Sequence, residues 1–579
     1  MEVTIPEKPC LVTTERGFSV SYHKRFLYSK YDPSRAIEAA IDSLQILPGT
    51  LILAVSPVLW LGLDSLLKKL PENSFVLGIE GEKTLHDFAT EALSALRAKA
   101  QTEEQRARVT LLPFEQNEYI VNVLTGERSQ NSSASENCSS IPHISHFRRA
   151  VLLEMSAGTQ FHKELYQKLA TLSQNAIASF WKNRITLTKM GRLYSRNLFK
   201  NLSNLPSSAD FTPFAHRIAE PIFVFGAGES IEKLLCTVPK ELIEKGFVIA
   251  VDAAGPALQS HGIKIDAVVA LEGQLAIEKA YIGSCAKNSL LIADCTSRPE
   301  VTRHAQTVTC IASKYTDASF FKNLSTQDYF PPLVPPLGSV GLTAVFIAIT
   351  LRENGNIPVF VSGLDFSFSL GRTHAKNTPA HILRLASSNR FTPPENYAAA
   401  FKNGAKKIIG KNGTEVFTDT ALENYAKSFV DMFGDIQNVY DCASQGLALG
   451  LPELSTEKLS AYLESIPCST RKSNWLESAA VYSPKAKETI RAFLETEEKA
   501  LNRIKELLMY GQDVASCSCS LDDELHQLIS AREYLFLHFP DGYKCDTASI
   551  SFLKRIRGQI DFFLKEIKQS LKTLGMSAI

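Results

Sequence analysis

The hydrophobic residues of this chain follow three patterns in succession. Short apolar runs such as Leu51–Val55 and Ser74–Ile79 lie near the N-terminus and have the length of buried strands. From Pro221 to about residue 450, apolar runs of four or five residues alternate with segments of helical length. After about residue 453 the apolar residues recur every three or four positions, which is typical of amphipathic helices.

These patterns predict an α/β protein. A central, mainly parallel Rossmann-like sheet domain is expected between a smaller N-terminal α/β domain and a C-terminal helical bundle. In the N-terminal domain a helix over Val58–Leu70 is predicted to follow the first strand. Residues 127–147 are rich in Ser and Asn, and this composition predicts a polar linker or loop. The predicted domains are 1–126 (N-terminal α/β), 148–214 (helical connector), 215–452 (central) and 453–579 (C-terminal helical).

The strands of the central region end next to acids. The predicted strands there are Ile222–Phe225, Val248–Val251, Ala267–Leu271, Leu290–Ala293, Thr307–Ile311 and Pro358–Ser362. The acids at or just after four of these strands are Asp252, Glu272, Asp294 and Asp365. Because parallel sheets bind ligands at the carboxyl ends of their strands, these acids are predicted to surround a site.

Two turns of small residues provide groups suited to a phosphate. Residues 226–230, G-A-G-E-S, join a strand to a helix, and residues 338–341, G-S-V-G, open another helix. Glycines let backbone amides approach a phosphate, and a helix N-terminus adds positive potential. Tight structural packing is the alternative explanation for either turn alone, but two turns in one sheet favour a nucleotide site. The predicted donor-binding residues are Gly226, Ala227, Gly228, Ser230, Asp252, Glu272, Gly338 and Ser339.

Composition excludes several classes of protein. The 579 residues carry a formal net charge of +1, so no global field for nucleic acid or a membrane surface is expected. The longest apolar run, Thr343–Leu351, is too short to span a bilayer. The N-terminus has acids and prolines where a signal peptide needs basic and then apolar residues, so a cytoplasmic protein is predicted. Eleven cysteines show no metal-ligand spacing, Cys517 and Cys519 being the only close pair; no metal site is predicted.

Six ordered motifs in about residues 215–450 resemble the motility-associated factor family of bacterial flagellin glycosyltransferases. They are G-A-G-E-S, I-A-V-D-A-A, I-D-A-V-V-A-L-E, G-S-V-G-L-T-A, V-F-V-S-G-L-D-F and G-R-T-H-A. I-I-G-K-N-G-T-E-V-F-T-D and Q-N-V-Y-D-C-A-S-Q-G resemble the end of that family's domain, and Leu27–Pro33 (L-Y-S-K-Y-D-P) resembles its opening motif. The family shares this core with archaeal 6-hydroxymethyl-dihydropterin diphosphokinases, and the core is similar to bacterial CMP-sialic-acid transferases. Two positions depart from the family pattern: Glu229 replaces its usual Pro, and Glu272 its usual Asp.

The resemblance implies transfer of a nonulosonic, sialic-acid-like sugar from a CMP donor to Ser or Thr of flagellin. The implied partners are flagellin and the nucleotide-sugar, and no cofactor is firmly implied. In such a reaction Asp365 would orient the ribose or the acceptor, and Arg372 would stabilise the departing CMP phosphate. His374 would deprotonate the acceptor hydroxyl. His381 is the alternative base, and a surface position without function is the other explanation for both histidines.

Two further functions stay open at this point. A pyrophosphoryl transfer like that of the pterin diphosphokinases would use ATP, with Mg²⁺ held by strand-end carboxylates. The extra N-terminal domain and C-terminal helices suit a large protein acceptor better than a small pterin. A non-catalytic flagellin-binding factor is the third possibility, which Glu229 favours because it places a negative charge where a donor phosphate would lie. The oligomeric state does not follow from the sequence.

Overall fold

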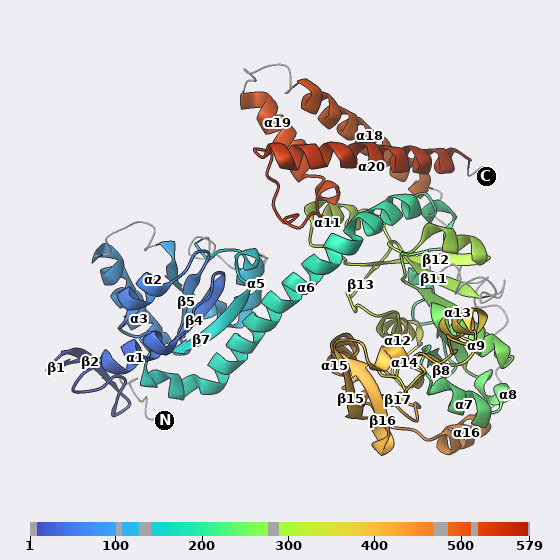
Figure 1. Cartoon of the computed structure of the whole chain (residues 1–579), viewed down its shortest axis with the longest axis horizontal. Helices are drawn as coiled ribbons and strands as arrows, with labels where there is room; N and C mark the ends of the chain where they lie inside the picture. The colour runs from blue at the N-terminus through green and yellow to red at the C-terminus, as the bar shows by residue number, and fades with distance from the viewer. Residues whose placement is uncertain are drawn as a thin grey trace. The chain divides into compact units, whose positions relative to one another are not determined.

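The computed structural model describes residues 8–99, 107–126, 140–275, 289–466, 485–510 and 519–576 (Figure 1). The chain forms two compact units, 1–187 and 188–579, and the boundary falls within helix α6 (Lys163–Leu202). Each unit contains a parallel sheet, and helices follow at the C-terminus. The predicted fold class is therefore confirmed. Among the residues that the structure describes, no helix is long and apolar enough to cross a membrane.

The first unit is built on a four-stranded parallel sheet with the order β6-β5-β4-β7. Its strands are β4 (Thr50–Val55), β5 (Phe75–Ile79), β6 (Val109–Leu111) and β7 (Arg149–Glu154). Successive residues of β4 enter two different cores, since side chains alternate across a sheet. One core is covered by α1 (Arg35–Ser43), α2 (Leu63–Lys69) and α3 (Lys83–Lys99), and the other by α5 (Ile120–Thr125) and α6. An antiparallel sheet of β1 (Cys10–Thr14), β2 (Gly17–Tyr22) and β3 (Arg25–Phe26) precedes them.

Two local expectations in this unit are wrong. The helix predicted over Val58–Leu70 begins only at Leu63, because Trp60 and Gly62 have left-handed backbone angles (φ +53° and +76°) that a right-handed helix excludes. The segment from residue 148 was predicted to be helical, but residues 149–154 form β7. Its short apolar run suits a strand or a helix, and pairing with β4 decides the outcome. The predicted polar linker lies mostly outside the described residues.

A buried carboxyl group lies just after β5. Glu80 has no exposed surface, and its Oε1 accepts hydrogen bonds from the Tyr166 hydroxyl (2.8 Å) and the Gly81 N–H (2.9 Å). Burial raises the pKa of Glu80 to about 7, although these hydrogen bonds act in the opposite direction. The other oxygen, Oε2, has no hydrogen-bond partner in the described part of the chain. The stability of this unit should therefore depend on protonation near neutral pH.

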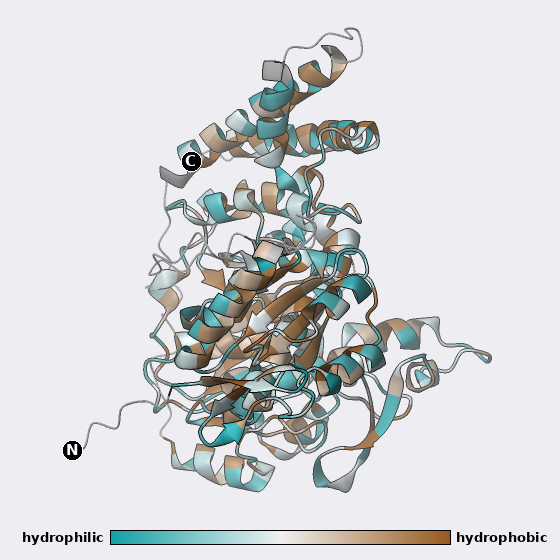
Figure 2. Cartoon of the chain, turned by 90° about the vertical axis from the view of Figure 1, so that its left-hand side faces the viewer, coloured by the Kyte–Doolittle hydropathy of each residue, from teal (hydrophilic) through white to brown (hydrophobic). Residues whose placement is uncertain are grey.

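The second unit is built on an eight-stranded parallel sheet with the order β13-β12-β11-β10-β9-β8-β14-β17. Its strands are β8 (Ile222–Phe225), β9 (Phe247–Val251), β10 (Ala267–Ala270), β11 (Leu290–Asp294), β12 (Thr307–Ser313), β13 (Leu333–Val334), β14 (Val359–Ser362) and β17 (Val439–Asp441). The strands from β8 to β11 are buried along their whole length, as expected when a parallel sheet is covered on both faces. Figure 2, coloured by hydropathy, shows strands of the chain that are mainly hydrophobic and helices that carry both hydrophobic and hydrophilic residues.

The order of the strands reverses once. The chain moves outward from β8 to β13 and returns through α12 (Val340–Leu351) to β14, which lies on the other side of β8. Helix α12 is apolar around most of its circumference and packs against β8, β9 and β10, as a buried helix must. The topological switch point of the sheet therefore lies between β8 and β14.

The chain after β14 adds two groups of elements to this unit. Between β14 and β17 lie α13 (Pro379–Ser387), α14 (Tyr397–Ala400), the hairpin β15 (Ala405–Ile409) and β16 (Glu415–Asp419), and α15 (Thr420–Phe433). The C-terminal helices are α16 (Thr456–Ser465), α18 (Lys485–Tyr510), α19 (Cys519–Ser530) and α20 (Ile550–Met576). The residues Leu494, Leu501, Ile504, Ile556, Ile560 and Phe563 are buried there. The apolar spacing of this region thus forms a helical core, as predicted.

Candidate functional site

The candidate site lies where β8 and β14 end side by side. The strands pair in parallel over their full length, from Ile222 with Val359 to Phe225 with Ser362. The turn at 226–230 follows β8, and the loop at 363–365 follows β14. A ligand of an open α/β sheet binds in the crevice outside such a switch point. Two motifs separated by more than a hundred residues in the sequence therefore meet at the position where this fold binds ligands.

Glycines in this turn allow two backbones to touch. A Cβ atom at Gly226 would lie 2.2 Å from the carbonyl oxygen of Gly363, and one at Gly228 would lie 2.6 Å from Cγ of Asp365. Gly363 has a φ of +78°, which L-residues with side chains rarely adopt. The Gly228 N–H donates to the Gly363 carbonyl at 2.9 Å. The glycines of the turn therefore have a packing role, whether or not a phosphate also binds there.

Ser230 and Asp365 hold the two loops together. The Ser230 N–H donates to Asp365 Oδ2 (2.9 Å), and the Ser230 hydroxyl donates to Oδ1 (2.5 Å). The same hydroxyl accepts from the Gly363 N–H at 3.0 Å. Asp365 is only 3% exposed, and burial raises its pKa to about 6 while the bonds from Ser230 act to lower it. The Asp365 carboxylate thus faces Ser230, and we name this arrangement the Ser230–Asp365 latch.

A buried ion pair between Lys411 and Asp441 lies near the latch, and the sequence had suggested no role for either residue. The Lys411 ammonium contacts the Asp441 carboxylate, and both side chains are almost fully buried. The Lys411 N–H also donates to the carbonyl of Gly446, and a Cβ at Gly446 would lie 2.8 Å from Asp365 Cα. The charge of Lys411 therefore opposes the rise in the pKa of Asp365. The motifs I-I-G-K-N-G and V-Y-D-C-A-S-Q-G contain this lysine and aspartate, but their proximity to Asp365 depends on the tertiary fold.

Glu229 does not stand as an isolated negative charge. Arg372 Nη1 forms an ion pair with Glu229 Oε1 (2.6 Å), and Nη2 contacts Glu232 Oε1. Although burial acts to lower the pKa of Arg372, the carboxylates of Glu232 and Glu229 raise it. Backbone bonds complete the contact, because the Ala375 N–H donates to the Ala227 carbonyl at 3.0 Å. The loop that carries Arg372 and His374 therefore lies against the glycine turn.

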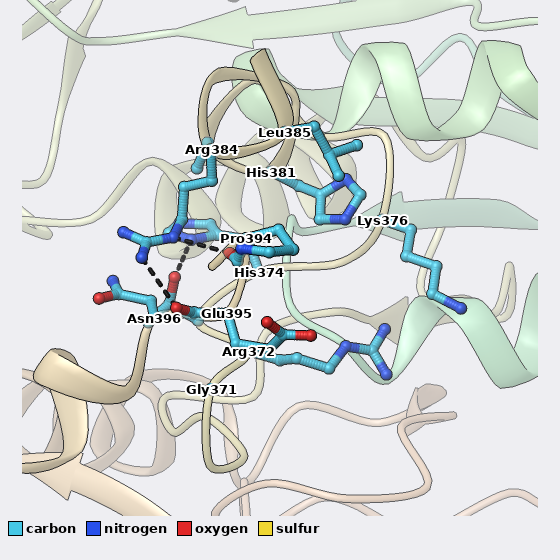
Figure 3. Close-up of a pocket in the computed structure, with 12 residues that line it drawn as sticks. Gly371, Arg372, His374, Lys376, His381, Arg384, Leu385, Pro394, Glu395 and Asn396 are labelled. Carbon is cyan, nitrogen blue, oxygen red and sulfur yellow. Dashed lines mark hydrogen bonds between the residues drawn. The ribbon is translucent and has the colours of Figure 1, made fainter. Parts of the chain in front are cut away.

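His374 and His381 line one cavity of about 190 Å³ (Figure 3). His374 keeps exposed surface; its Nδ1 lies 3.1 Å from the Thr373 hydroxyl, and desolvation by the protein atoms packed around the imidazole lowers its pKa. His381 Nδ1 accepts from the Asn377 N–H at 3.2 Å. A neutral imidazole can accept a proton at neutral pH. The cavity therefore contains two candidate bases.

The walls of this cavity include residues for which the sequence suggested no role. Arg384 donates from Nε to the Pro394 carbonyl and from Nη2 to the Glu395 carbonyl, both at 2.8 Å. These bonds connect α13 to the segment at 394–396, and Asn396 closes the same side of the cavity (Figure 3). A basic residue on a helix gives no local indication of such a role. The cavity exists only because the folded segment turns back on itself.

Asp252 and Glu272 form a second polar group along the same edge of the sheet. Asp252 Oδ1 accepts from the Ala253 N–H at 2.7 Å; burial raises the pKa of Asp252 to about 7, and the Glu272 carboxylate adds to this rise. Glu272 is exposed. The two acids follow β9 and β10, the next strands after β8, so Glu272 lies about 10 Å along the edge from the end of β8 at the usual strand spacing. Asp294, by contrast, is buried and accepts bonds from Thr296 and Ser313, which gives it a structural environment.

Gly338 and Ser339 begin α12 close to the switch point. Ser339 is the N-cap residue, and its hydroxyl accepts from the Gly341 N–H at 3.3 Å. Gly338 has a φ of +71°, a backbone angle that favours glycine over residues with a side chain. A Cβ added at Gly341 would lie 2.4 Å from Leu364 Cδ2. A Cβ added at Gly226 would lie 2.5 Å from the same atom. The helix start and the glycine turn therefore contact the same leucine, and both lie at one edge.

Known proteins resemble all or part of this chain. Residues 196–371 match the model of a family described as "6-hydroxymethylpterin diphosphokinase MptE-like". The match includes the glycine turn and Asp365 and ends at Gly371, directly before Arg372. The chain is 31% identical over 578 residues to a Treponema pallidum (strain Nichols) protein described as an uncharacterized protein, over 96% of this chain and 94% of the relative. A solved structure, the Maf glycosyltransferase from Magnetospirillum magneticum AMB-1, aligns with a TM-score of 0.49 and 14% identity over 100% of this chain and 94% of that one.

The family model confirms the MptE-like core that the motifs predicted. It begins in α6, before the predicted start at 215, and ends before the predicted end at 452. Since the identity to the Treponema pallidum protein extends over nearly the whole of both chains, this protein belongs to the same family as that relative, and it carries an MptE-like domain.

Proposed function

We propose that this protein is a glycosyltransferase that moves a nonulosonic, sialic-acid-like sugar from a CMP donor to Ser or Thr of flagellin. The observation that carries the proposal is the meeting of the 226–230 turn, the start of α12 and the Asp365 loop at one switch point within an MptE-like domain. This is where an α/β sheet binds a nucleotide. The choice of donor and acceptor rests on the resemblance of the motifs to motility-associated factors.

In this reaction the bond between the anomeric carbon and the CMP phosphate breaks, and its electron pair leaves with the phosphate oxygen. The acceptor hydroxyl oxygen forms the new bond, and its proton passes to an imidazole. His374 fits the role of base, since it lines the cavity beside the glycine turn and its pKa is lowered, which leaves the imidazole neutral and able to accept a proton. The products are the glycosylated hydroxyl, CMP and a protonated histidine, which later releases its proton to water.

In this proposal Asp365 and Arg372 do not contact the substrate; they act through the turn that receives it. Asp365 is a positioning residue, because its two oxygens accept bonds from Ser230 and so fix the turn that receives the donor. Arg372 forms ion pairs with Glu229 and Glu232 next to the same turn, so that one net negative charge remains on the three groups. A donor phosphate that approaches there meets one guanidinium and two carboxylates rather than the single unpaired acid that the sequence suggests. Ser339, Gly338 and the backbone of 226–228 would supply hydrogen bonds to the donor.

A pterin diphosphokinase-like reaction is the second candidate, and the family model favours it. Such a reaction needs Mg²⁺, which proteins often bind through one or two carboxylates together with substrate phosphates. No group of three or more His, Cys, Asp or Glu suited to a metal occurs in the described ranges, but Asp252 and Glu272 fit a cation shared with phosphates. They would hold the ion, which would neutralise phosphate charge when bound. A non-catalytic flagellin-binding factor remains the third candidate.

One set of incubations separates these functions. Purified protein is mixed with a CMP-nonulosonic acid and unglycosylated recombinant flagellin, and the mass of intact flagellin is measured. A parallel mixture contains ATP, Mg²⁺ and 6-hydroxymethyl-dihydropterin, and AMP is measured. We expect a mass increase of one sugar per modified site and no AMP. AMP without modified flagellin would replace the proposal by the diphosphokinase, and flagellin binding with neither product would indicate the binding factor.

A further inference from the structure

The segment from 370 to 401 presents an uncovered apolar surface. Its helix α13 contains no buried residue, although a nine-residue helix of a globular protein normally buries one face. Seven large hydrophobic residues are exposed on this segment: Leu370, Ile382, Leu383, Leu385, Phe391, Tyr397 and Phe401. Phe391 is 90% exposed and Phe401 77%. Large apolar side chains left exposed in this number along one segment favour a contact with another macromolecule. We call residues 370–401 the docking segment.

The docking segment is also basic. It contains four Arg or Lys residues and a single acid, Glu395, whereas the whole chain has a net charge of +1. Arg372 is neutralised by Glu229 of the glycine turn and by Glu232 just after it. Lys376 lies near Glu232 and helps to lower the pKa of that carboxyl, whereas no ion pair with a carboxylate is formed by Arg384 or Arg390 within the described ranges of the chain. The partner that covers the apolar residues should therefore bring negative charge to this surface.

A second copy of this chain is a poor candidate for that partner. In a twofold symmetric dimer the same surface meets itself, so the three cations of one copy would face the same cations of the other. Like charges placed together at an interface are destabilising. An acidic partner of a different sequence meets no such repulsion.

The docking segment is continuous with the candidate active site. His381, Arg384 and Leu385 on α13 line the cavity that contains His374 (Figure 3). A polypeptide that covers the exposed face of α13 thus reaches the rim of the cavity that contains the candidate base. A hydroxyl on that polypeptide can therefore enter the cavity directly. A polypeptide bound elsewhere would need a long loop to bring a hydroxyl to the same place.

We propose that the docking segment binds the protein acceptor of the transfer reaction, through an acidic stretch of the acceptor that also carries apolar side chains. This inference rests on the proposed function, because it assigns the surface to the acceptor of that reaction. It separates the two substrates in space, with the donor at the β8–β14 switch point and the acceptor on α13 and the segments around Phe391 and Phe401. The cavity with His374 then joins the two surfaces.

The test uses the full-length protein and unglycosylated recombinant flagellin. The variant Phe391→Ser/Phe401→Ser removes two exposed aromatic side chains, and Arg390→Glu reverses one charge. Ile550→Ser is the matched control, since Ile550 is 72% exposed in the same unit and lies outside the docking segment. Three readouts are measured for each variant: the Kd for flagellin, the KM for flagellin in sugar transfer, and the rate of donor hydrolysis without flagellin.

We expect the double variant and Arg390→Glu each to raise the Kd and the KM for flagellin by about tenfold or more, the effect of losing an aromatic or arginine hot spot. Donor hydrolysis and circular dichroism should match the parent protein, and Ile550→Ser should change nothing. Unchanged flagellin affinity in both variants would overturn the inference. It would also fall if sedimentation showed a parent dimer that the double variant dissociates.

The failure of this inference and the failure of the proposed function give different results. If the parent protein neither hydrolyses nor transfers the donor, the glycosyltransferase proposal fails, while the Kd measurements still report on the surface. If transfer proceeds and the variants retain the parent KM, the reaction stands and the acceptor docks elsewhere. A loss of flagellin binding in the variants of an inactive protein would assign the docking segment to a binding factor and overturn its role in catalysis.

Discussion

Replacing Ser230 by alanine tests whether the Ser230–Asp365 latch holds the candidate site together. The substitution removes the hydroxyl that donates to Asp365 Oδ1 and accepts from the Gly363 N–H. The bond from Ser230 N–H to Oδ2 remains, because it comes from the backbone. Both lost bonds are buried, so water cannot replace the hydroxyl as a partner of the Asp365 carboxylate or of the Gly363 N–H.

The size of the effect follows from these two bonds. A hydrogen bond to a charged group contributes about 1.5–3 kcal/mol and one between neutral groups about 0.5–1.5 kcal/mol. The latch hydroxyl should therefore contribute about 2–4 kcal/mol to the local stability of β8 and β14. At about 1.4 kcal/mol per factor of ten, the opening of these strands should become about 30 to 1,000 times more frequent.

Hydrogen exchange followed by mass spectrometry measures this opening directly. Peptides that contain β8 or β14 should exchange faster in Ser230→Ala, whereas peptides from β4 in the first unit should exchange at the parent rate. Ser339→Ala is the matched control: it removes a helix cap and a proposed donor contact, so CMP affinity should fall about five- to thirtyfold, the loss of one buried hydrogen bond. The exchange of β8 should stay near the parent rate in that control.

A second substitution shows whether Asp365 is the partner that matters. In a double-mutant cycle of Ser230→Ala and Asp365→Asn, the effects on β8 exchange should not add, because both changes break the same bond. Parent-like exchange in Ser230→Ala would refute the reasoning, and so would additive effects in the cycle. Either result would mean that the glycine packing alone keeps the loops together.

Three further predictions concern charge and proton transfer. The folded Glu80 keeps its proton to about pH 7, whereas the unfolded carboxyl loses it near 4.5. The first unit should therefore lose about 3 kcal/mol of stability as pH rises across that window. In Glu80→Gln this loss should disappear, as measured by hydrogen exchange of β5 peptides after correction for the intrinsic exchange rate at each pH. His374→Ala should lower turnover about 10²–10⁴-fold with donor affinity kept, and activity should fall only below pH 6.5 because the pKa of His374 is lowered; His381→Ala is the control, and a loss there instead would identify His381 as the base. Glu229→Pro should tighten donor binding, because it removes one of the two carboxylates that contact Arg372, and the effect should be smaller in high salt. Weaker binding, matched by chelator treatment of the parent, would reveal a bridging cation.

Much of the fold could be predicted because it depends on local periodicity. The apolar runs of β8 to β12 and the uniformly apolar helix α12 each identify an element from its own residues. The spacing around Leu501 and Ile504 likewise indicates a helix with one buried face. Where an apolar run is too short to show a period, as in residues 149–154, the local pattern leaves strand and helix equally open, and strand pairing decides.

The candidate site shows the same division. The residue types at 226–230, Asp365 and His374 indicated a site, and the sequence placed the first two correctly at strand ends. It could not show that Asp365 bonds Ser230 across 135 residues, or that Arg372 neutralises Glu229. Glu229, read alone, is an unpaired charge.

The amino-acid sequence by itself therefore determined the elements, their alternation and the edge of the sheet at which polar residues gather. Those properties depend on neighbours three or four positions apart and on the parallel connection of strands. The tertiary structure alone decided that β14 returns beside β8, which brings Ser230 to Asp365, Arg372 to Glu229 and Lys411 to Asp441. Charges and hydrogen bonds act over a few ångströms, so their partners are selected by the path of the chain through space and not by distance along it.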